Sequence, residues 1–327
     1  MPTAAERLPM HWTTGPARPP SGSPTDVAQP EGAAPGGLDR GTVASLLVVV
    51  TLTALCYPLI TVGSAYAAPF QFATLRAGVA GAALGLLAVA LRRPFPRSLR
   101  LWLLIALSGF SATSIGFLSM FMAAGLVSPG VATVVAGTQP IIAALVALVI
   151  FGEPFGKGHG VGMLVSLLGI AAIAAPDLAA GGVRASAGIG LVILATLGTA
   201  LGNAVTKRLA GDVDAIAAAA AQLLFGALPL AALSYATEPW TVRLVAPAFL
   251  ASLAVLALGG TAITYWLWIR ILSRSPLNSA NAFMFLVPLL GVAISAVFLE
   301  ERIGPLTVLG MGLAIGGVVL ASRGAGS

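Results

Sequence analysis

Apolar residues run along this chain in blocks of about 20, and short segments rich in proline, glycine or charged residues separate the blocks. A helix needs about 20 predominantly apolar residues to cross the hydrocarbon core of a bilayer. The pattern therefore predicts an all-α membrane protein with ten transmembrane helices. The predicted spans cover residues 43–63, 69–91, 101–124, 130–151, 160–176, 187–206, 214–236, 247–269, 278–299 and 305–322.

The first 41 residues depart from this pattern. They are rich in Pro, Gly, Ser and Ala and contain no apolar run. Such a segment buries too little apolar surface to offset the entropy lost on ordering. We expect residues 1–41 to form a disordered cytoplasmic tail. We expect no ordinary signal peptide, because no apolar h-region precedes a cleavage site.

Composition supports the membrane class. The 327 residues are 58% hydrophobic and 9% charged, whereas a soluble domain carries roughly 25% charged residues. The net charge of +6 does not indicate nucleic-acid binding, because the basic residues lie mainly in short loops between apolar blocks. A single cysteine, Cys56, excludes an internal disulfide framework, and the sequence predicts neither a metal site nor a cofactor.

The loop charges predict an orientation. With the amino terminus in the cytoplasm, thirteen basic residues fall on the cytoplasmic side and three on the opposite side, and Arg76 within a span completes the 17. The positive-inside rule then predicts that both termini are cytoplasmic. We expect a multi-pass protein of the inner or plasma membrane, and the sequence leaves a homodimer open.

The two halves of the chain contain a repeat. The stretch "EPFGKGHGVGMLVSLLGIAA" from Glu153 aligns with "ERIGPLTVLGMGLAIGGVVL" from Glu301 at an offset of 148 residues. The same offset pairs Pro140 with Pro288. Such self-similarity indicates that one structural unit occurs twice.

Each unit holds five predicted helices, in residues 42–176 and 187–323. Because five is odd, the second unit must enter the membrane upside down. Inverted repeats are typical of alternating-access transporters, whose substrate site lies near the bilayer midplane between the repeats. Further upstream the offset is 146, and it pairs Arg76 with Gln222.

Three stretches carry a resemblance to a known family: "PFQFATLRAGVAG", "SPGVATVVAGTQPIIAALVALVIFGE" and "SPLNSANAFMFLVPLLGVAISAVFLEERIGPLTVLGMGLAIGGVVLA". The chain resembles ten-helix, EamA-type members of the drug/metabolite transporter superfamily over residues 42–322. The resemblance implies two five-helix repeats around a central cavity. It also implies efflux of amino acids or related metabolites.

Arg76 is the one charge in the second predicted span. An arginine at the centre of a membrane helix costs about 2.5–3.5 kcal/mol on insertion scales, so such residues usually face a cavity and bind something. Its guanidinium could attract a carboxylate of the cargo. Two structural alternatives remain open: the side chain snorkels to the headgroups, or it binds free carbonyls at a neighbouring helix end.

Other polar side chains within the spans are candidates for substrate binding. A buried amide or phenol needs a hydrogen-bond partner, so helix–helix bonding and core filling are the structural alternatives for each. The further candidates for the substrate site are Gln222, Asn203, Tyr57, Tyr265, Asn281 and Gln139.

Four residues are candidates for gating or hinge motion. Pro140 and Pro288 would each remove a hydrogen bond from a helix interior and kink it. Glu153 and Glu301 precede the fifth and tenth spans, where a carboxylate stabilises a helix amino terminus. Static bends and simple capping are the alternatives, but the inverted repeat would put one glutamate on each membrane face.

No Asp, Glu or His falls in the middle of a predicted span. Proton relays usually use such side chains, so facilitated diffusion or substrate exchange is the simpler hypothesis. The sequence thus predicts a secondary transporter, an exporter of a small metabolite such as an amino acid, a related zwitterion or a monocarboxylate. Alternatives are a neutral or cationic drug-like cargo, a channel or sensor, and an intramembrane enzyme.

Overall fold

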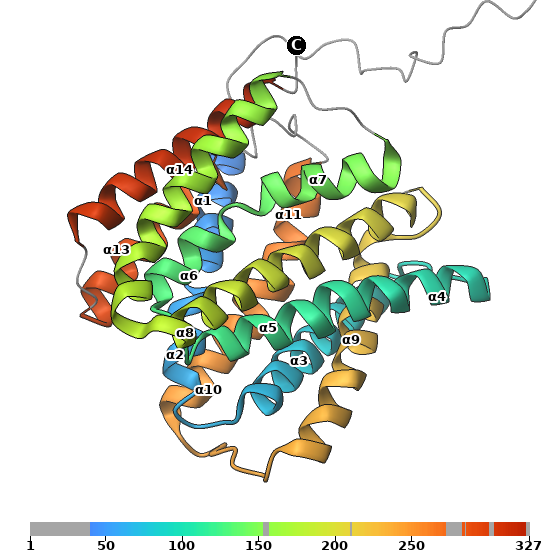
Figure 1. The fold of residues 1–327 in the computed structure, drawn as a ribbon. Helices are drawn as coiled ribbons and strands as arrows, with labels where there is room; N and C mark the ends of the chain where they lie inside the picture. Colours follow the sequence, from blue (N-terminus) through green and yellow to red (C-terminus); the bar gives the residue numbers. More distant parts are fainter. Residues whose placement is uncertain are drawn as a thin grey trace, which may run out of the picture. The chain divides into compact units, whose positions relative to one another are not determined.

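A computed structural model of the protein describes residues 40–152, 157–209, 211–272, 283–284, 286–300 and 304–324. These residues belong to one compact unit, Leu38–Ser327. Within the described ranges the elements are helices (Figure 1). The predicted disordered tail lies outside them.

The first four predicted spans correspond to helices, three of which are interrupted or locally altered. In chain order they are α1 (Arg40–Ala54) with α2 (Cys56–Gly63), then α3 (Pro69–Ala90), then α4 (Leu99–Ser108), the π-helix η1 (Gly109–Ile115) and α5 (Gly116–Ala123), then α6 (Pro129–Ala136) with α7 (Gln139–Phe151).

The fifth and sixth spans are both part of α8 (Lys157–Leu209), which is broken at Gly182, where φ is 53° and ψ is −125°. The loop expected at residues 177–186 is therefore reduced to that break. The remaining elements are α9 (Ala215–Thr237), α10 (Pro247–Ala254), the π-helix η2 (Val255–Ile263), α11 (Thr264–Leu272), α13 (Leu286–Phe298) and α14 (Pro305–Gly324).

The helices have the length and surface of membrane spans. Seven described stretches are long and apolar enough to cross a bilayer, and three shorter apolar stretches cover Gly160–Ile173, Leu286–Phe298 and Pro305–Gly317. Large apolar side chains such as Leu86 and Val149 lie exposed, as a lipid-facing surface requires. The prediction of an all-α, multi-pass membrane protein is confirmed.

The third and eighth spans share an irregularity. A shift of 148 residues superimposes them in sequence, and both π-helices then end at paired isoleucines, Ile115 and Ile263. π-helical turns inside α-helices are rare and occur frequently at functional sites. The repeat therefore extends to a local backbone feature that the sequence did not predict.

Small residues bring two pairs of helices together. Gly169 of α8 lies against Gly310 and Ala314 of α14, and Gly317 lies against Ser166, whose hydroxyl donates to the Ala314 carbonyl at 3.0 Å. As residue numbers rise along α8 they fall along α14, so the two helices run antiparallel (Figure 1). Glycines permit such close approach of membrane helices.

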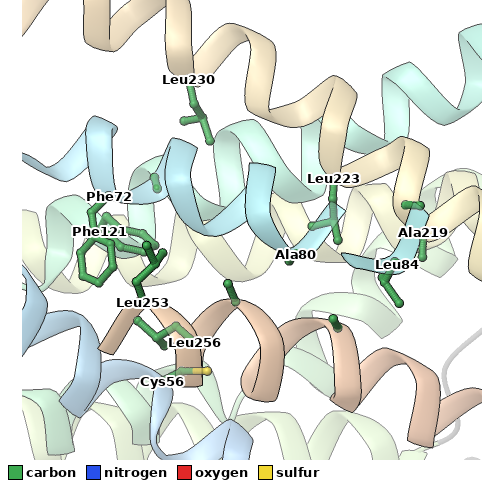
Figure 2. Packing of buried hydrophobic residues seen from close by; sticks show 14 of the residues in the cluster. Cys56, Phe72, Ala80, Leu84, Phe121, Ala219, Leu223, Leu230, Leu253 and Leu256 are labelled. Atoms are coloured by element: carbon green, nitrogen blue, oxygen red, sulfur yellow. The ribbon is translucent and has the colours of Figure 1, made fainter. Parts of the chain in front are cut away.

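The second pair, α3 and α9, also runs antiparallel. Gly81 lies against Leu223 and Leu224, whereas Gly85 lies nearest to Ala220. Buried apolar side chains fill the region between α3, α5, α9 and η2 (Figure 2). Phe72 is at its centre, with its ring centroid 4.9 Å from that of Phe121. This core surrounds the stretch of α3 that carries Arg76.

The two hinge prolines have different surroundings. Pro140 lies in the first turn of α7, directly after the helix breaks at Gly137 and Thr138. Proline is tolerated in a first turn, where its missing N–H would have no helical partner, so Pro140 is not in the interior of a continuous helix as expected. Pro288 is buried in α13 and lies close to Gly137. Both glutamates of the gating prediction, Glu153 and Glu301, lie outside the described residues.

Candidate functional site

Arg76 is buried in the middle of α3. Only 4% of its surface is exposed, and its neighbours along that face of the helix, Phe72, Ala73 and Ala80, are fully buried. A guanidinium in this position does not reach the headgroups, so the snorkelling alternative does not apply. The charge is kept inside the apolar core described above.

The guanidinium contacts three other helical segments through side chains. Its Nε donates to Thr261 Oγ1 at 3.2 Å, Nη1 lies 3.7 Å from Met120 Sδ, and Nη2 lies 3.5 Å from Cys56 Sγ. Thioether and thiol sulfurs are weak acceptors. Of the five N–H groups, only one is thus directed at an oxygen of the described residues, and none at a backbone carbonyl.

Aromatic rings line the same group. The Arg76 Cζ atom lies 4.5 Å from the ring centroid of Phe117 and 5.9 Å from that of Phe121. Cation–π attraction of this kind is worth about 0.5–2 kcal/mol, less than a paired carboxylate in a buried site. Among the described residues, Arg76 has no carboxylate partner.

The π-helix η2 orients the Thr261 hydroxyl that contacts Arg76. The Thr261 hydroxyl donates to the Leu256 carbonyl at 2.9 Å, five residues earlier in the chain. Thr264 makes the same type of bond to Gly259 at 3.0 Å. Because the hydroxyl proton of Thr261 is used within η2, its oxygen can accept from Arg76.

Gln222, which the 146-residue offset pairs with Arg76, lies in a more polar group. It is 6% exposed, and its Oε1 accepts from Ser108 at 2.9 Å and from Thr206 at 3.5 Å. The Ser108 hydroxyl is also 3.0 Å from the Gly202 carbonyl. Gln222 thus joins α4, α8 and α9, as the helix–helix alternative predicts.

Two tyrosines of the predicted site lie near Arg76. Tyr265 of α11 is half-buried and packs against the apolar core that surrounds Arg76. Tyr57 is buried in α2, directly after Cys56, whose sulfur contacts Arg76, but its ring belongs to a second apolar cluster. Arg76 and Tyr265 therefore share one region of the core.

The other candidates do not join this region. Asn203 is exposed on α8 and Gln139 is half-buried at the start of α7, and neither side chain has a hydrogen bond with the group among the residues described. Asn281 lies outside the described residues.

Sequence reasoning missed Thr261, Met120 and Phe117. A usable signal was present: the 148-residue shift pairs Phe117 with Tyr265, and Thr113 with Thr261.

Hydrogen bonds join the start of α3 to the segment just after α9, and these contacts are called the first tie. The Glu238 carboxylate, just after α9, accepts from the backbone N–H groups of Phe70 and Gln71 at 2.9 Å each, and from Ser234 at 3.1 Å. Gln71 in turn donates to the Pro239 carbonyl at 2.7 Å. A carboxylate at a helix amino terminus is favoured by the helix dipole, so this tie fixes the start of α3.

The second tie lies at the start of α9. Asp214 caps that helix by accepting from Ile216 and Ala217. Its carboxylate also lies 3.6 Å from the Arg93 guanidinium, which follows α3. The side chain of Arg93 is 48% exposed and that of Asp214 is 16% exposed, so water screens this ion pair.

The apolar helices and the buried charge define a multi-pass membrane protein. The chain belongs to the EamA-like transporter family, which matches it twice, at residues 41–175 and 186–323. The two matches cover the two predicted repeats.

Relatives described as transporters agree with the transporter class. The chain is 28% identical over 274 residues to an "uncharacterized transporter" of Synechocystis sp., covering 78% of this chain and 82% of that one. It is also 28% identical over 294 residues to a "probable terminal-alkyne amino-acid exporter" of Streptantibioticus cattleyicolor, covering 88% and 94%. A crystal structure that is 20% identical, with a TM-score of 0.61, covers 86% of this chain and 96% of its own; it supports the fold alone.

Proposed function

We propose that this protein is a secondary transporter that exports a small metabolite bearing a carboxylate, an amino acid or a related zwitterion or monocarboxylate. The observation that carries the proposal is Arg76, a buried guanidinium with one oxygen acceptor and no carboxylate partner among the described residues. A charge in that state gains most from an anionic ligand. The amino-acid exporter among the relatives supports the same cargo class.

Transport proceeds by alternating access between two inverted five-helix repeats, residues 42–176 and 187–323, with both termini in the cytoplasm. The antiparallel crossings of α8 with α14 and of α3 with α9 support the inversion. Arg76 and its pseudo-symmetric partner Gln222 lie at the second of these crossings, where the substrate site of such transporters is expected.

The ties at the two ends of α3 and α9 serve as gates. With both termini cytoplasmic, Glu238 closes the outer end and the Arg93–Asp214 pair closes the cytoplasmic end. Glu153, Glu301, Pro140 and Pro288 remain candidates for a second layer of the gates. The cargo gradient drives transport by exchange or facilitated diffusion.

Counterflow in proteoliposomes tests the proposal. Vesicles preloaded with an unlabelled amino acid should take up the labelled one faster than empty vesicles, because a carrier exchanges its cargo. Arg76→Ala should abolish this acceleration while the protein still folds and inserts. Equal uptake by preloaded and empty vesicles would indicate a channel, and acceleration only by neutral or cationic compounds would remove the carboxylate from the proposal.

A further inference from the structure

The terminal nitrogens of Arg76 differ from its Nε in what they contact. Nε is held by a hydroxyl oxygen, whereas Nη1 and Nη2 face only the sulfur atoms of Met120 and Cys56 among the described residues. These two nitrogens form the planar fork that binds a carboxylate with two parallel hydrogen bonds. A role of this fork in cargo binding rests on the proposed function.

Thr261 determines which edge of the guanidinium has an oxygen partner within the protein. Its proton is committed to the Leu256 carbonyl by the five-residue spacing of η2, so its oxygen faces Nε as an acceptor. An ordinary α-helical turn would direct a threonine hydroxyl to the carbonyl four residues earlier. The π-helix therefore orients the hydroxyl that fixes the Arg76 side chain at one edge.

The sulfur atoms are contacts that an anion can displace. Cys56 donates its own proton toward the Leu52 carbonyl at 3.6 Å, and accepts from Arg76 only weakly. Replacing two sulfur contacts by two carboxylate oxygens exchanges weak hydrogen bonds for charge-assisted ones. A single guanidinium between apolar and aromatic walls suits one negative charge and leaves a dianion half neutralised.

We propose that the edge formed by Nη1 and Nη2, between Met120 and Cys56, is the carboxylate subsite of the cargo, and that Thr261 is the positioning residue that presents it. Recognition is of the carboxylate and not of an ammonium, because no Asp or Glu side chain contacts this group among the residues the structure describes. The cargo class is a monocarboxylate, with or without an amine.

Thermal-shift titration of the purified protein tests the subsite with three probes of similar shape. Sodium 4-methylpentanoate has the carboxylate alone, L-leucine has both groups, and 3-methylbutylamine has the ammonium alone. Both acids should raise the melting temperature with increasing concentration at constant ionic strength, because binding stabilises the folded form. Stabilisation by the amine alone, or by none of the three, overturns the inference.

Matched variants test whether the Nη1–Nη2 edge of Arg76 binds the carboxylate. Thr261→Val should weaken binding of 4-methylpentanoate about tenfold, the loss of roughly one hydrogen bond to a charged group, and Thr261→Ser should retain it. Cys56→Ser should weaken binding, because a hydroxyl is a stronger acceptor that competes with the carboxylate for Nη2, and Cys56→Ala should not. A purely structural Thr261 would lower the melting temperature without ligand and leave the affinity unchanged, which overturns the positioning role.

If Thr261→Val does not fold, the comparison of Cys56→Ser with Cys56→Ala still tests the carboxylate subsite. Counterflow separates the two proposals. Counterflow that depends on Arg76, together with unchanged affinity in Thr261→Val or equal affinities in the Cys56 pair, rejects the subsite and leaves the transporter standing. Absence of counterflow with every cargo tried in the unmodified protein rejects the proposed function itself.

Discussion

Arg76 and Gln222 occupy paired positions in the two halves of the chain, yet their surroundings differ. The Gln222 Oε1 atom accepts from the Ser108 hydroxyl at 2.9 Å and lies 3.5 Å from the Thr206 hydroxyl. Arg76 carries a full charge but contacts one hydroxyl, two sulfurs and two rings. The paired positions thus hold a neutral amide whose oxygen has a hydroxyl donor, and a charged guanidinium with one oxygen acceptor among the described residues.

The difference separates a structural polar residue from one that awaits a ligand. A buried polar group that is fully hydrogen-bonded contributes to stability, whereas an under-satisfied one costs free energy. A protein retains such a cost where function requires it. The contrast therefore predicts that changes at Arg76 affect transport most, and that changes near Gln222 affect mainly stability.

The largest effect is expected from Arg76→Gln, which makes the two paired positions identical. Counterflow should fall by about two orders of magnitude, the loss of roughly two charge-assisted hydrogen bonds, while the melting temperature stays the same or rises. Proteoliposome counterflow and thermal unfolding of the same preparation measure both. Arg76→Lys is the control: it keeps the charge but loses the planar fork. A variant that loses stability instead of transport would contradict the contrast.

The second effect concerns packing. Gly226, on the Gln222 side, lies against Thr113 and the Gly109 carbonyl, and the 146-residue offset pairs it with Ala80, which already has a methyl group. Gly226→Ala should destabilise the protein by about 1–3 kcal/mol through overpacking, with transport per folded molecule little changed. Melting temperature is the measurement. Gly78→Ala is the control, because a methyl there meets no neighbour, and an equal loss in both variants would refute the packing argument.

A similar or smaller loss is expected from Gln222→Leu. The change removes the acceptor of Ser108 and Thr206 and should cost about 1–2 kcal/mol of stability, with less than a tenfold loss of counterflow. Ser108→Ala should then cost less in this background than alone, since one of the contacts of Ser108 is already gone while that with the Gly202 carbonyl remains. Strictly additive losses in the double variant would show that the two side chains do not act together.

The smallest effect is expected at the ties. Glu238→Gln should lower stability by about 0.5–1 kcal/mol, because a neutral amide interacts less well with the amino terminus of α3. Arg93→Gln, at the exposed pair, should cost less than about 0.5 kcal/mol. Thermal unfolding at low salt compares the two, and a greater loss from Arg93→Gln would reverse the order proposed for them.

The helices could be predicted because blocks of about 20 apolar residues have few alternatives in a membrane protein. Arg76 was identifiable by its charge, and Gln222 by the repeat offset. Thr261 was missed although the 148-residue shift pairs it with Thr113, because its role depends on the π-helix, which sequence periodicity does not reveal. The break between the fifth and sixth spans lies at Gly182, within the gap between the predicted blocks 160–176 and 187–206, although the helices extend further into that gap than the blocks did.

The unequal ties have a consequence for which compartment loads the carrier. Rupture of an exposed ion pair costs up to about 1 kcal/mol, whereas freeing Glu238 breaks three hydrogen bonds to a carboxylate at once. If the ties act as the proposed gates, two of these bonds, from Phe70 and Gln71, join Glu238 to α3, and the Arg93 end is expected to open more often. In the proposed orientation the empty carrier is therefore open mainly toward the cell interior. Bound cargo would have to offset the larger free-energy cost of opening the Glu238 end toward the outside. Net flow still follows the cargo gradient, because unequal gates change which state the carrier rests in but not the direction in which an uncoupled carrier runs.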